Sequence, residues 1–248
     1  DPEWANVYRD LEIPRGPVDS EPAEVPVWND YLSWCGHHAN AHLLTDQYVQ
    51  QGARQYYAMI SLIDECIGKV IRQLDKQGVL DNTWIVYSSD HGEMLGDHGL
   101  MAKFNFYRSS VQVPLIVRPP GGCEPWVSDS LAATVDIGPT LLEAAKAEPL
   151  EGIRGHSLLP VIAQQASERD FLFSEIQKQS REAQAPVFRA VRNNRYRLTL
   201  ETNTKTPCEL FDLVEDPNEL HNRVSDVSLS PVLAELTDQL YSSCQNSA

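Results

Sequence analysis

Long hydrophobic runs are absent from this sequence of 248 residues. A membrane-spanning helix needs about 20 consecutive, mostly apolar residues, and no stretch approaches that length. The first residues, DPEWANVYRD, also lack the basic start and the apolar centre of a signal peptide. We therefore expect a soluble chain with no membrane partner.

Basic residues are scarce. Lysine and arginine together number 20 against 35 aspartates and glutamates, which gives a net charge of −15. A protein that binds the phosphate backbone of nucleic acid needs a basic face, so we expect no nucleic-acid partner. An anionic substrate would need a local cation, either a metal or a placed lysine, to offset the surrounding negative field.

Cysteines are few and dispersed, at positions 35, 66, 123, 208 and 244, with no C-x-x-C pair. Such a set predicts mostly free thiols and favours a cytoplasmic location. The 42% of hydrophobic residues is enough to build one large domain or two small ones.

Three regions follow one another along the chain. Residues 1–45 are proline-rich, and because proline disrupts long helices and central strands we expect an irregular segment. Residues 46–165 are expected to form an α/β region, and residues 166–248 a smaller α+β subdomain.

The α/β region is predicted from periodicity. Apolar residues spaced by three and four predict a long amphipathic helix from about residue 46 to 77, ended by Gly78. The segment TWIVYSS predicts a buried strand, and VQVPLIVRPP, residues 111–120, predicts the next one. Helix, short loop and buried strand form half of a βαβ unit. A further helix is expected from about residue 136 to 147.

The sequence pattern changes in the last region, residues 166–248. FLFSEI, VFRAVRNNRYRLTL and ELFDL predict an antiparallel sheet, with Asn193 and Asn194 as a two-residue turn. A final helix is expected to begin at Ser230. Its apolar stripe is formed by Leu233, Leu236 and Leu240.

The stretch SSDHGEMLGDHGLMAKFNFY, residues 88–107, carries the candidate chemistry. Asp90 and His91 directly follow a predicted strand, where ligands collect in open α/β sheets, and Gly92 allows a tight turn. A carboxylate and an imidazole can converge on one divalent cation, which needs about four to eight donors in all. The alternative is that Asp90 caps a helix and His91 is hydrogen-bonded in the core.

Lys103 favours the metal-site interpretation. It stands between Ala102 and Phe104, and a half-buried ammonium group is unfavourable unless it meets an anion. A lysine at the edge of a metal site suits a tetrahedral oxyanion. His98 could also reach a substrate from this loop, although a histidine bound to loop backbone is an alternative.

Other polar groups lack a diagnostic pattern. His38 and His42 have the i, i+4 spacing of a zinc pair, but Ala39 stands where a zincin would have glutamate. We interpret these two and His37 as surface or substrate-rim residues. Glu175 could shape the pocket or link the two subdomains.

The run SDHGEMLGDHGLMAKFNFYRSSVQVPLIVRPPGG resembles the C-terminal signature of the sulfatases, within the alkaline-phosphatase-like superfamily that also holds phosphonate monoester hydrolases. VDIGPTLLEAA, GIRGHSLLP, RYRLTL and ELFDLVEDPNELHN follow in the family's order. The resemblance covers about residues 48–225. It implies an α/β fold: the C-terminal part of an alkaline-phosphatase-like mixed sheet flanked by helices, followed by the small subdomain with its antiparallel sheet and C-terminal helix.

The resemblance also implies roles for individual residues. Asp90 and His91 would be two metal ligands, and Lys103 would contact the sulfate and the leaving oxygen of a small sulfate monoester. The implied cation is Ca²⁺, while the imidazole also suits Mn²⁺ or Zn²⁺. The family's nucleophile is a formylglycine made from cysteine or serine in a C/S-x-P-x-R motif.

The sequence departs from the family at that nucleophile. Cys123 and Pro125 begin a C-x-P, but Val127 replaces the arginine, and the family's paired aspartates have no counterpart. We therefore expect the C-terminal part of a larger sulfatase, whose partner is the missing N-terminal part of the same protein. A phosphonate or phosphate mono- or diester hydrolase and a non-catalytic module remain as alternatives.

Overall fold

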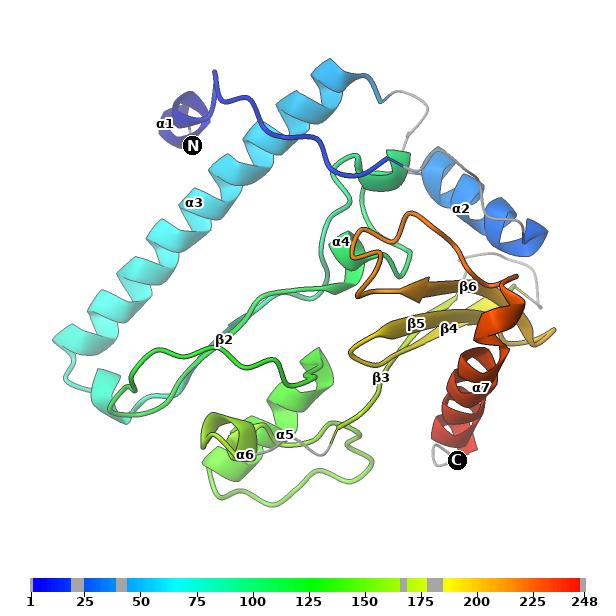
Figure 1. The fold of residues 1–248 in the computed structure, drawn as a ribbon. Helices are drawn as coiled ribbons and strands as arrows, with labels where there is room; N and C mark the ends of the chain where they lie inside the picture. The colour runs from blue at the N-terminus through cyan, green and yellow to red at the C-terminus, as the bar shows by residue number, and fades with distance from the viewer. Residues whose placement is uncertain (1, 19–24, 39–43, 166–168, 178–184, 246–248) are drawn as a thin grey trace.

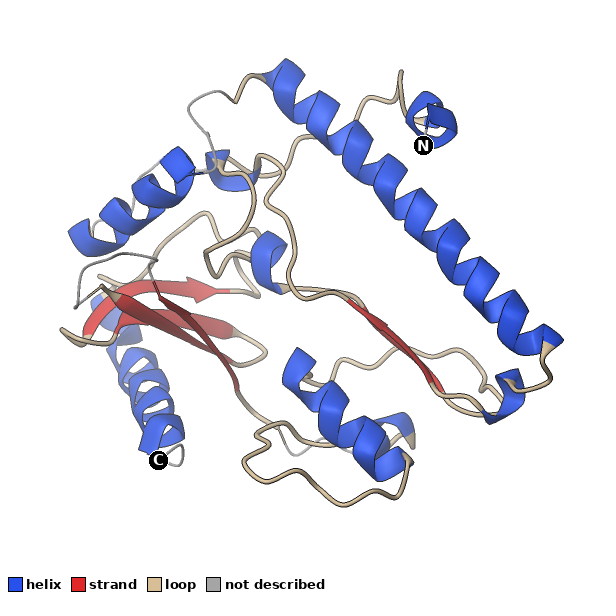
Figure 2. Cartoon of the chain, turned by 180° about the vertical axis from the view of Figure 1, so that it is seen from behind, coloured by secondary structure: helices blue, strands red, loops and turns tan. Residues whose placement is uncertain are grey.

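The computed structural model describes residues 2–18, 25–38, 44–165, 169–177 and 185–245. Figure 1 shows an open arch in which the long helix α3 lies along one side and a four-stranded sheet with helix α7 lies on the other. A two-stranded ribbon crosses the space between them, as the view from behind in Figure 2 also shows. Within the described residues, every helix is too short or too polar to cross a membrane.

The proline-rich start contains two helices, α1 (Pro2–Val7) and α2 (Pro26–His38). The prediction of an irregular segment is wrong here. Pro26 is the first residue of α2, a position where proline is tolerated because the missing N–H has no helical partner. Trp28 and Tyr31 of α2 are fully buried, and Trp28 stacks on Phe106. Helix α2 is therefore part of the core.

The long helix is confirmed as α3 (Asp46–Lys76), and the 3-10 helix η2 (Leu80–Asn82) follows it. The side chain of Thr45 caps its start, and Gly78 adopts a positive φ of 69° just beyond its end. The apolar stripe is buried at Val49 and Ala53 but exposed further along, as at Ile63.

The central ribbon consists of β1 (Ile85–Ser88) and β2 (Leu115–Arg118), which pair antiparallel. Both strands are only half-buried or exposed, so the prediction of buried strands in a βαβ unit is wrong for this pair. The reason lies in the intervening loop, whose ends are joined by a hydrogen bond from Gly92 N to Ser110 O. The chain therefore returns along its own path instead of crossing over.

Short helices lie between β1 and β2 and in the segment that follows β2: η3 (Asp97–Gly99), α4 (Arg108–Val111), η4 (Thr134–Asp136), α5 (Ile137–Ala144) and α6 (Leu159–Ile162). Helix α5 confirms the helix predicted after residue 136. The buried carboxylate of Asp136 holds this region together, because it accepts hydrogen bonds from the backbone of Ala133 and His156 and pairs with Arg169.

The antiparallel sheet predicted for the last region is confirmed. Strands β3 (Leu172–Gln177), β4 (Val187–Arg192), β5 (Tyr196–Glu201) and β6 (Thr206–Asp212) lie in sequence order, each antiparallel to the next. The 3-10 helix η5 (Val227–Leu229) leads into α7 (Ser230–Gln245). Leu236 and Leu240 of α7 are buried against the sheet, with Leu233 packed beside them.

The turn between β4 and β5 is longer than predicted. It spans three residues, because β4 ends at Arg192 and β5 begins at Tyr196. The side chain of Asn193 accepts hydrogen bonds from the backbone N–H groups of Arg195 and Tyr196. The mixed α/β class and the C-terminal helix agree with the sequence, and the described cysteines 35, 66, 123 and 208 are free thiols.

Candidate functional site

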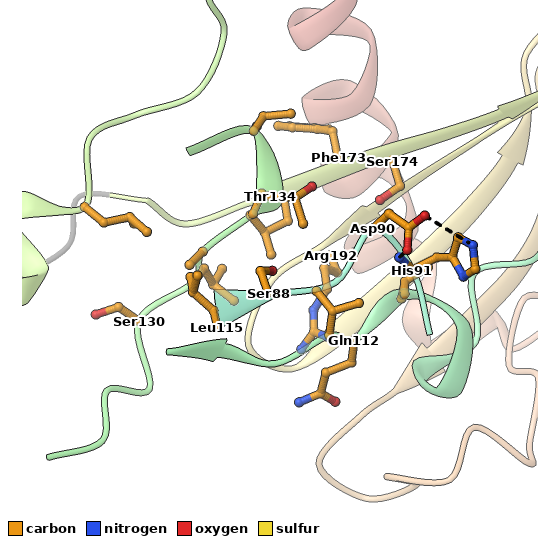
Figure 3. Close-up of a pocket in the computed structure, with 18 of the residues that line it drawn as sticks. Ser88, Asp90, His91, Gln112, Leu115, Ser130, Thr134, Phe173, Ser174 and Arg192 are labelled. Carbon is orange, nitrogen blue, oxygen red and sulfur yellow. Dashed lines mark hydrogen bonds and ion pairs between the residues drawn. The ribbon is translucent and has the colours of Figure 1, made fainter. Parts of the chain in front are cut away.

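A hollow of about 1380 Å³ opens between the central ribbon, the loop after β1 and the strands β3–β5. Three residues predicted from the sequence line it: Asp90, His91 and Lys103. Figure 3 shows the first two on its wall, with an interaction drawn between them. The tertiary structure thus brings the predicted carboxylate, imidazole and ammonium groups to one concave surface.

Asp90 lies immediately after β1 and presents its carboxylate to solvent, with its side chain 83% exposed. Its Oδ1 accepts a hydrogen bond from the backbone N–H of His91 at 2.9 Å. That bond lowers the pKa of Asp90, with smaller contributions in the same direction from the His91 side chain and the Ser89 hydroxyl. The ionised form of the carboxylate is therefore favoured.

The ring of His91 is oriented by a neighbouring carbonyl. Its Nδ1 lies 2.8 Å from the oxygen of Gly92, and because a carbonyl only accepts, Nδ1 carries the proton in the neutral ring. The lone pair is then on Nε2, which lies 3.5 Å from Oδ2 of Asp90. A backbone carbonyl on one nitrogen and a free lone pair on the other is the usual arrangement of a metal-binding histidine.

Gly92 is required by a close backbone approach. A Cβ at this position would lie 2.0 Å from the carbonyl oxygen of Ser109. Gly92 N also donates to Ser110 O at 2.7 Å, so the two ends of the loop touch here. This contact places His91 at the base of the loop that carries Lys103.

Lys103 is held by its neighbours in the loop. Ala102 and Phe104, on either side of it, have positive φ values of 63° and 81°, a conformation that is unfavourable for residues other than glycine. Glu93 accepts a hydrogen bond from Ala102 N at 2.5 Å, and Met94 N donates to Ala102 O at 2.8 Å. These bonds stabilise the strained segment and fix the base of the lysine side chain.

Helix α2 binds the backbone of Phe104, the residue that follows Lys103. The hydroxyl of Tyr31 and the thiol of Cys35 both donate to the carbonyl of Phe104, at 2.7 and 3.3 Å. The ammonium group of Lys103 lies 5.5 Å from the centre of the Phe104 ring. These contacts could not be predicted from the sequence, since α2 was expected to be loop.

Among the other histidines singled out in the sequence, His98 is the one whose side chain the structure describes. The ring of His98 stacks on Tyr107 with centroids 3.8 Å apart, and its backbone N–H donates to Pro17 O. His98 is not among the residues that line the hollow. The side chains of His37 and His38, and all of His42, fall outside the described residues.

Glu175 lies on β3 and lines the hollow, where it pairs with Arg189 of the neighbouring strand at 2.5 Å. This ion pair lies within one sheet and does not link the two regions of the chain. Cys123 also borders the hollow as an exposed free thiol.

The donors present fit part of a divalent-cation site. The described residues contain no group of three or more His, Cys, Asp or Glu side chains placed to hold a metal. The lone pair on His91 Nε2 and the ionised carboxylate of Asp90 nevertheless meet at one point. Further oxygen donors would be needed to complete the shell of Ca²⁺ or a similar ion.

Sequence reasoning missed a buried charged cluster around Arg197, which also lines the hollow. Arg197 is 2% exposed and pairs with Glu209 at 2.9 Å and with Glu219 at 2.7 Å. Burial disfavours its charged form, but the two glutamates outweigh that effect and raise the pKa of Arg197. Arg192 and Asn105 also line the hollow. The only signal in the sequence was an arginine within a segment expected to form a strand.

Two family models match the chain. One is described as Sulfatase and matches residues 12–147, and the other is described as N-sulphoglucosamine sulphohydrolase, C-terminal, and matches residues 96–246. Each covers more than half of the chain, and together they span nearly all of it.

Individual relatives agree with the family models. The "Uncharacterized sulfatase YidJ" of Escherichia coli (strain K12) is 34% identical over 75% of this chain and 36% of its own length. An N-acetylglucosamine-6-O-sulfatase of Bacteroides thetaiotaomicron is 33% identical over 70% of this chain and 32% of its own. The chain thus spans about a third of the length of these curated relatives.

A solved structure shows the same fold. The phosphonate monoester hydrolase SpPMH from Silicibacter pomeroyi superposes with a TM-score of 0.84 at 26% identity, over 97% of this chain and 53% of that one. The family models, the relatives and this superposition extend across both regions of the chain, including the loop with Asp90, His91 and Lys103. The chain belongs to the sulfatase family, within the alkaline-phosphatase-like superfamily.

Proposed function

We propose that the intact protein containing this chain hydrolyses small sulfate monoesters with the help of a divalent cation. The observation that carries the proposal is the meeting of His91 Nε2 and the Asp90 carboxylate on a hollow that Lys103 also lines. Membership of a family of hydrolases supports it.

Asp90 and His91 would hold the cation from one side. When bound, the cation would polarise a sulfate oxygen and offset negative charge, which matters in a chain of net charge −15. Ca²⁺ suits an oxygen-rich site with one imidazole, and Mn²⁺ or Zn²⁺ would also accept these donors. The hydrogen bond from His91 Nδ1–H to the carbonyl oxygen of Gly92 would hold the ring in place as a ligand.

Lys103 would act on the leaving group. Its protonated amine can donate a hydrogen bond to the ester oxygen as negative charge develops there, which stabilises the departing alkoxide. The bonds that fix Ala102 and Phe104 orient the lysine before substrate arrives. The nucleophile would be a formylglycine outside these 248 residues, since Val127 takes the place of the arginine that the motif requires after Cys123.

The test is turnover of 4-nitrophenyl sulfate by the purified intact protein, compared with the Lys103→Met variant. We expect hydrolysis by the wild type and a loss of about 100-fold or more in kcat for the variant, because one positioned charge donor is removed. A variant with an unchanged kcat would remove Lys103 from the reaction.

A second candidate is hydrolysis of phosphonate monoesters, favoured by the superposition on SpPMH. Sulfate and phosphonate esters present similar tetrahedral oxyanions to the cation and the lysine. The two are separated by measuring kcat/KM for 4-nitrophenyl sulfate and for 4-nitrophenyl phenylphosphonate on the same preparation. A much higher value for the phosphonate would contradict the sulfatase assignment.

A further inference from the structure

Arg192 and Arg197 are direct partners across the β4–β5 pair. Residues opposite each other in an antiparallel pair have side chains on the same face, with Cβ atoms about 5 Å apart. Two like charges in this arrangement repel each other unless each has a counter-charge. The hydrogen-bond partners of each guanidinium therefore show whether a buried donor is left without an acceptor.

Arg197 has its counter-charges. Its Nη1 donates to Glu209 and its Nε donates to Glu219, and the second glutamate also accepts from the backbone N–H of Arg108 at 2.6 Å. The guanidinium lies 4.8 Å from the centre of the Phe211 ring. Both carboxylates thus hydrogen-bond Arg197, while Glu219 also favours the charged form of Arg192 and Oε1 of Glu209 has no partner among the described residues.

The guanidinium of Arg192 has fewer partners than that of Arg197. Among the residues that the structure describes, its buried Nε has no hydrogen-bond partner. Burial lowers the pKa of Arg192, and the like charges of Arg197 and Arg108 lower it further against the opposing effect of Glu219. A guanidinium without a hydrogen bond at a buried nitrogen is unfavourable by itself, so the position is suited to an added anion.

Further orphan donors lie on the same hollow. Asn105 is 1% exposed and its Nδ2 has no partner among the described residues, and the same holds for Nη2 of the buried Arg197. Both residues line the hollow together with Arg192, Asp90 and His91. Figure 3 shows Arg192 among the side chains that line the hollow. Three buried N–H groups without acceptors thus border the space in which a substrate would lie.

We propose that Arg192, assisted by the free donors of Asn105 and Arg197, binds a second anionic group carried by the alcohol part of the substrate. A carboxylate or a further sulfate has the acceptor oxygens that these donors lack, and guanidinium groups bind such oxyanions with paired hydrogen bonds. This inference rests on the proposed function and deepens it, because the anion site would favour sulfate esters that carry a second acidic group over neutral ones.

A carboxylate elsewhere in the intact protein would offer Arg192 the same acceptor oxygens as an acidic substrate, and the experiment separates these two sources. Arg192→Gln is made in the intact protein, with Arg189→Gln as a matched control on the same strand, where the ion pair with Glu175 is exposed. KM and kcat are measured for phenyl sulfate and for 3-carboxyphenyl sulfate. We expect the variant to raise KM about tenfold for the carboxylated ester and less than twofold for phenyl sulfate, because a charge-assisted hydrogen bond is lost only in the first case.

Binding is measured separately by calorimetry with the desulfated products, 3-hydroxybenzoate and phenol. We expect 3-hydroxybenzoate to bind the wild type and the control about tenfold more tightly than Arg192→Gln. This readout needs no turnover, so an inactive wild type would overturn the proposed function and leave the anion site to be judged by binding alone. Equal binding by all three proteins would overturn the anion site.

Thermal unfolding of each variant completes the test. A large fall in Tm for Arg192→Gln, with the same preference between the two esters as the wild type, would mean that a carboxylate of the protein itself pairs with Arg192. That result would overturn the substrate site. Arg192→Lys, which keeps the charge, is expected to retain part of the preference for the carboxylated ester and a Tm close to that of the wild type.

Discussion

The hydroxyl of Tyr31 lies 2.7 Å from the carbonyl oxygen of Phe104 and donates a hydrogen bond to it. This bond joins helix α2 to the residue that follows Lys103. Removing the hydroxyl with Tyr31→Phe leaves the carbonyl with the weaker thiol donor Cys35 at 3.3 Å. We expect a loss of about 1 kcal/mol in the free energy of unfolding and a kcat several-fold lower, with KM little changed.

Denaturant unfolding and steady-state kinetics of the intact protein check this prediction. Tyr8→Phe is the matched control, because the Tyr8 hydroxyl bonds to Ser61 of α3, outside the hollow. If both variants lower kcat alike, the effect does not act through the segment that holds Lys103.

Asp90→Asn tests the metal site. The change keeps the shape of the side chain but removes the charge that faces His91 Nε2, so the affinity for the divalent cation should fall at least tenfold. Elemental analysis measures cation content after dialysis, and calorimetry measures affinity. Asp75→Asn, on the surface of α3, controls for the loss of one acidic charge. Unchanged cation content in Asp90→Asn would contradict the assignment of Asp90 as a ligand.

Gly92→Ala tests the close approach in the loop. The new Cβ would lie 2.0 Å from Ser109 O, so the backbone must shift where His91 and the Lys103 loop meet. We expect a loss of about 1–3 kcal/mol in stability and a fall of about 100-fold in kcat.

Gly138→Ala is the control, because its Cβ would meet Ile153 at an ordinary 3.6 Å and alanine favours the helix α5. This variant should be as stable as the wild type or slightly more stable. Thermal unfolding of the two variants side by side gives the comparison, and equal effects would contradict the steric argument.

The lowered pKa of Asp226 predicts that the stability of the protein depends on pH. The Ser228 hydroxyl, Arg223 and the Ser228 backbone N–H bind its carboxylate and lower its pKa to about 2. The unfolded chain has an ordinary value of about 3.9, so the carboxylate stabilises the fold above that pH and this contribution is lost as the pH falls towards 2.

The wild type should therefore exceed Asp226→Asn in stability at pH 6, and the difference should shrink between about pH 4 and pH 2. Urea unfolding at a series of pH values measures it. A difference that stays constant across this range would show that the carboxylate charge of Asp226 does not contribute.

Some elements could be predicted because their signals are local. The three- and four-residue spacing that begins at Val49 defined α3, and the strands around Asn193 gave the antiparallel sheet. The adjacent Asp90 and His91 could be recognised as candidate metal ligands, because two donors that are neighbours in the sequence are also close in space. Lys103 was placed beside them by the motif they share.

Other features depend on contacts between distant residues. Helix α2 was missed because its prolines argue for loop, whereas its stability comes from burying Trp28 against Phe106 and Phe188. The antiparallel pairing of β1 with β2 was missed because one strand pattern fits either direction. Which direction forms is fixed by the contact between Gly92 and Ser110 across the loop.

The sequence by itself determined the candidate site residues Asp90, His91 and Lys103 and the positions of the long helix and the antiparallel sheet, because these depend on neighbours within a few residues. Only the tertiary structure decided which groups share the hollow. His98 stacks on Tyr107, while Arg192, about a hundred residues along the chain from Asp90, lines the same hollow as Asp90. The physical reason is that burial and charge balance are properties of the packed chain, and a strand pattern shows neither which residue will lie opposite Arg192 nor whether an anion will lie between them.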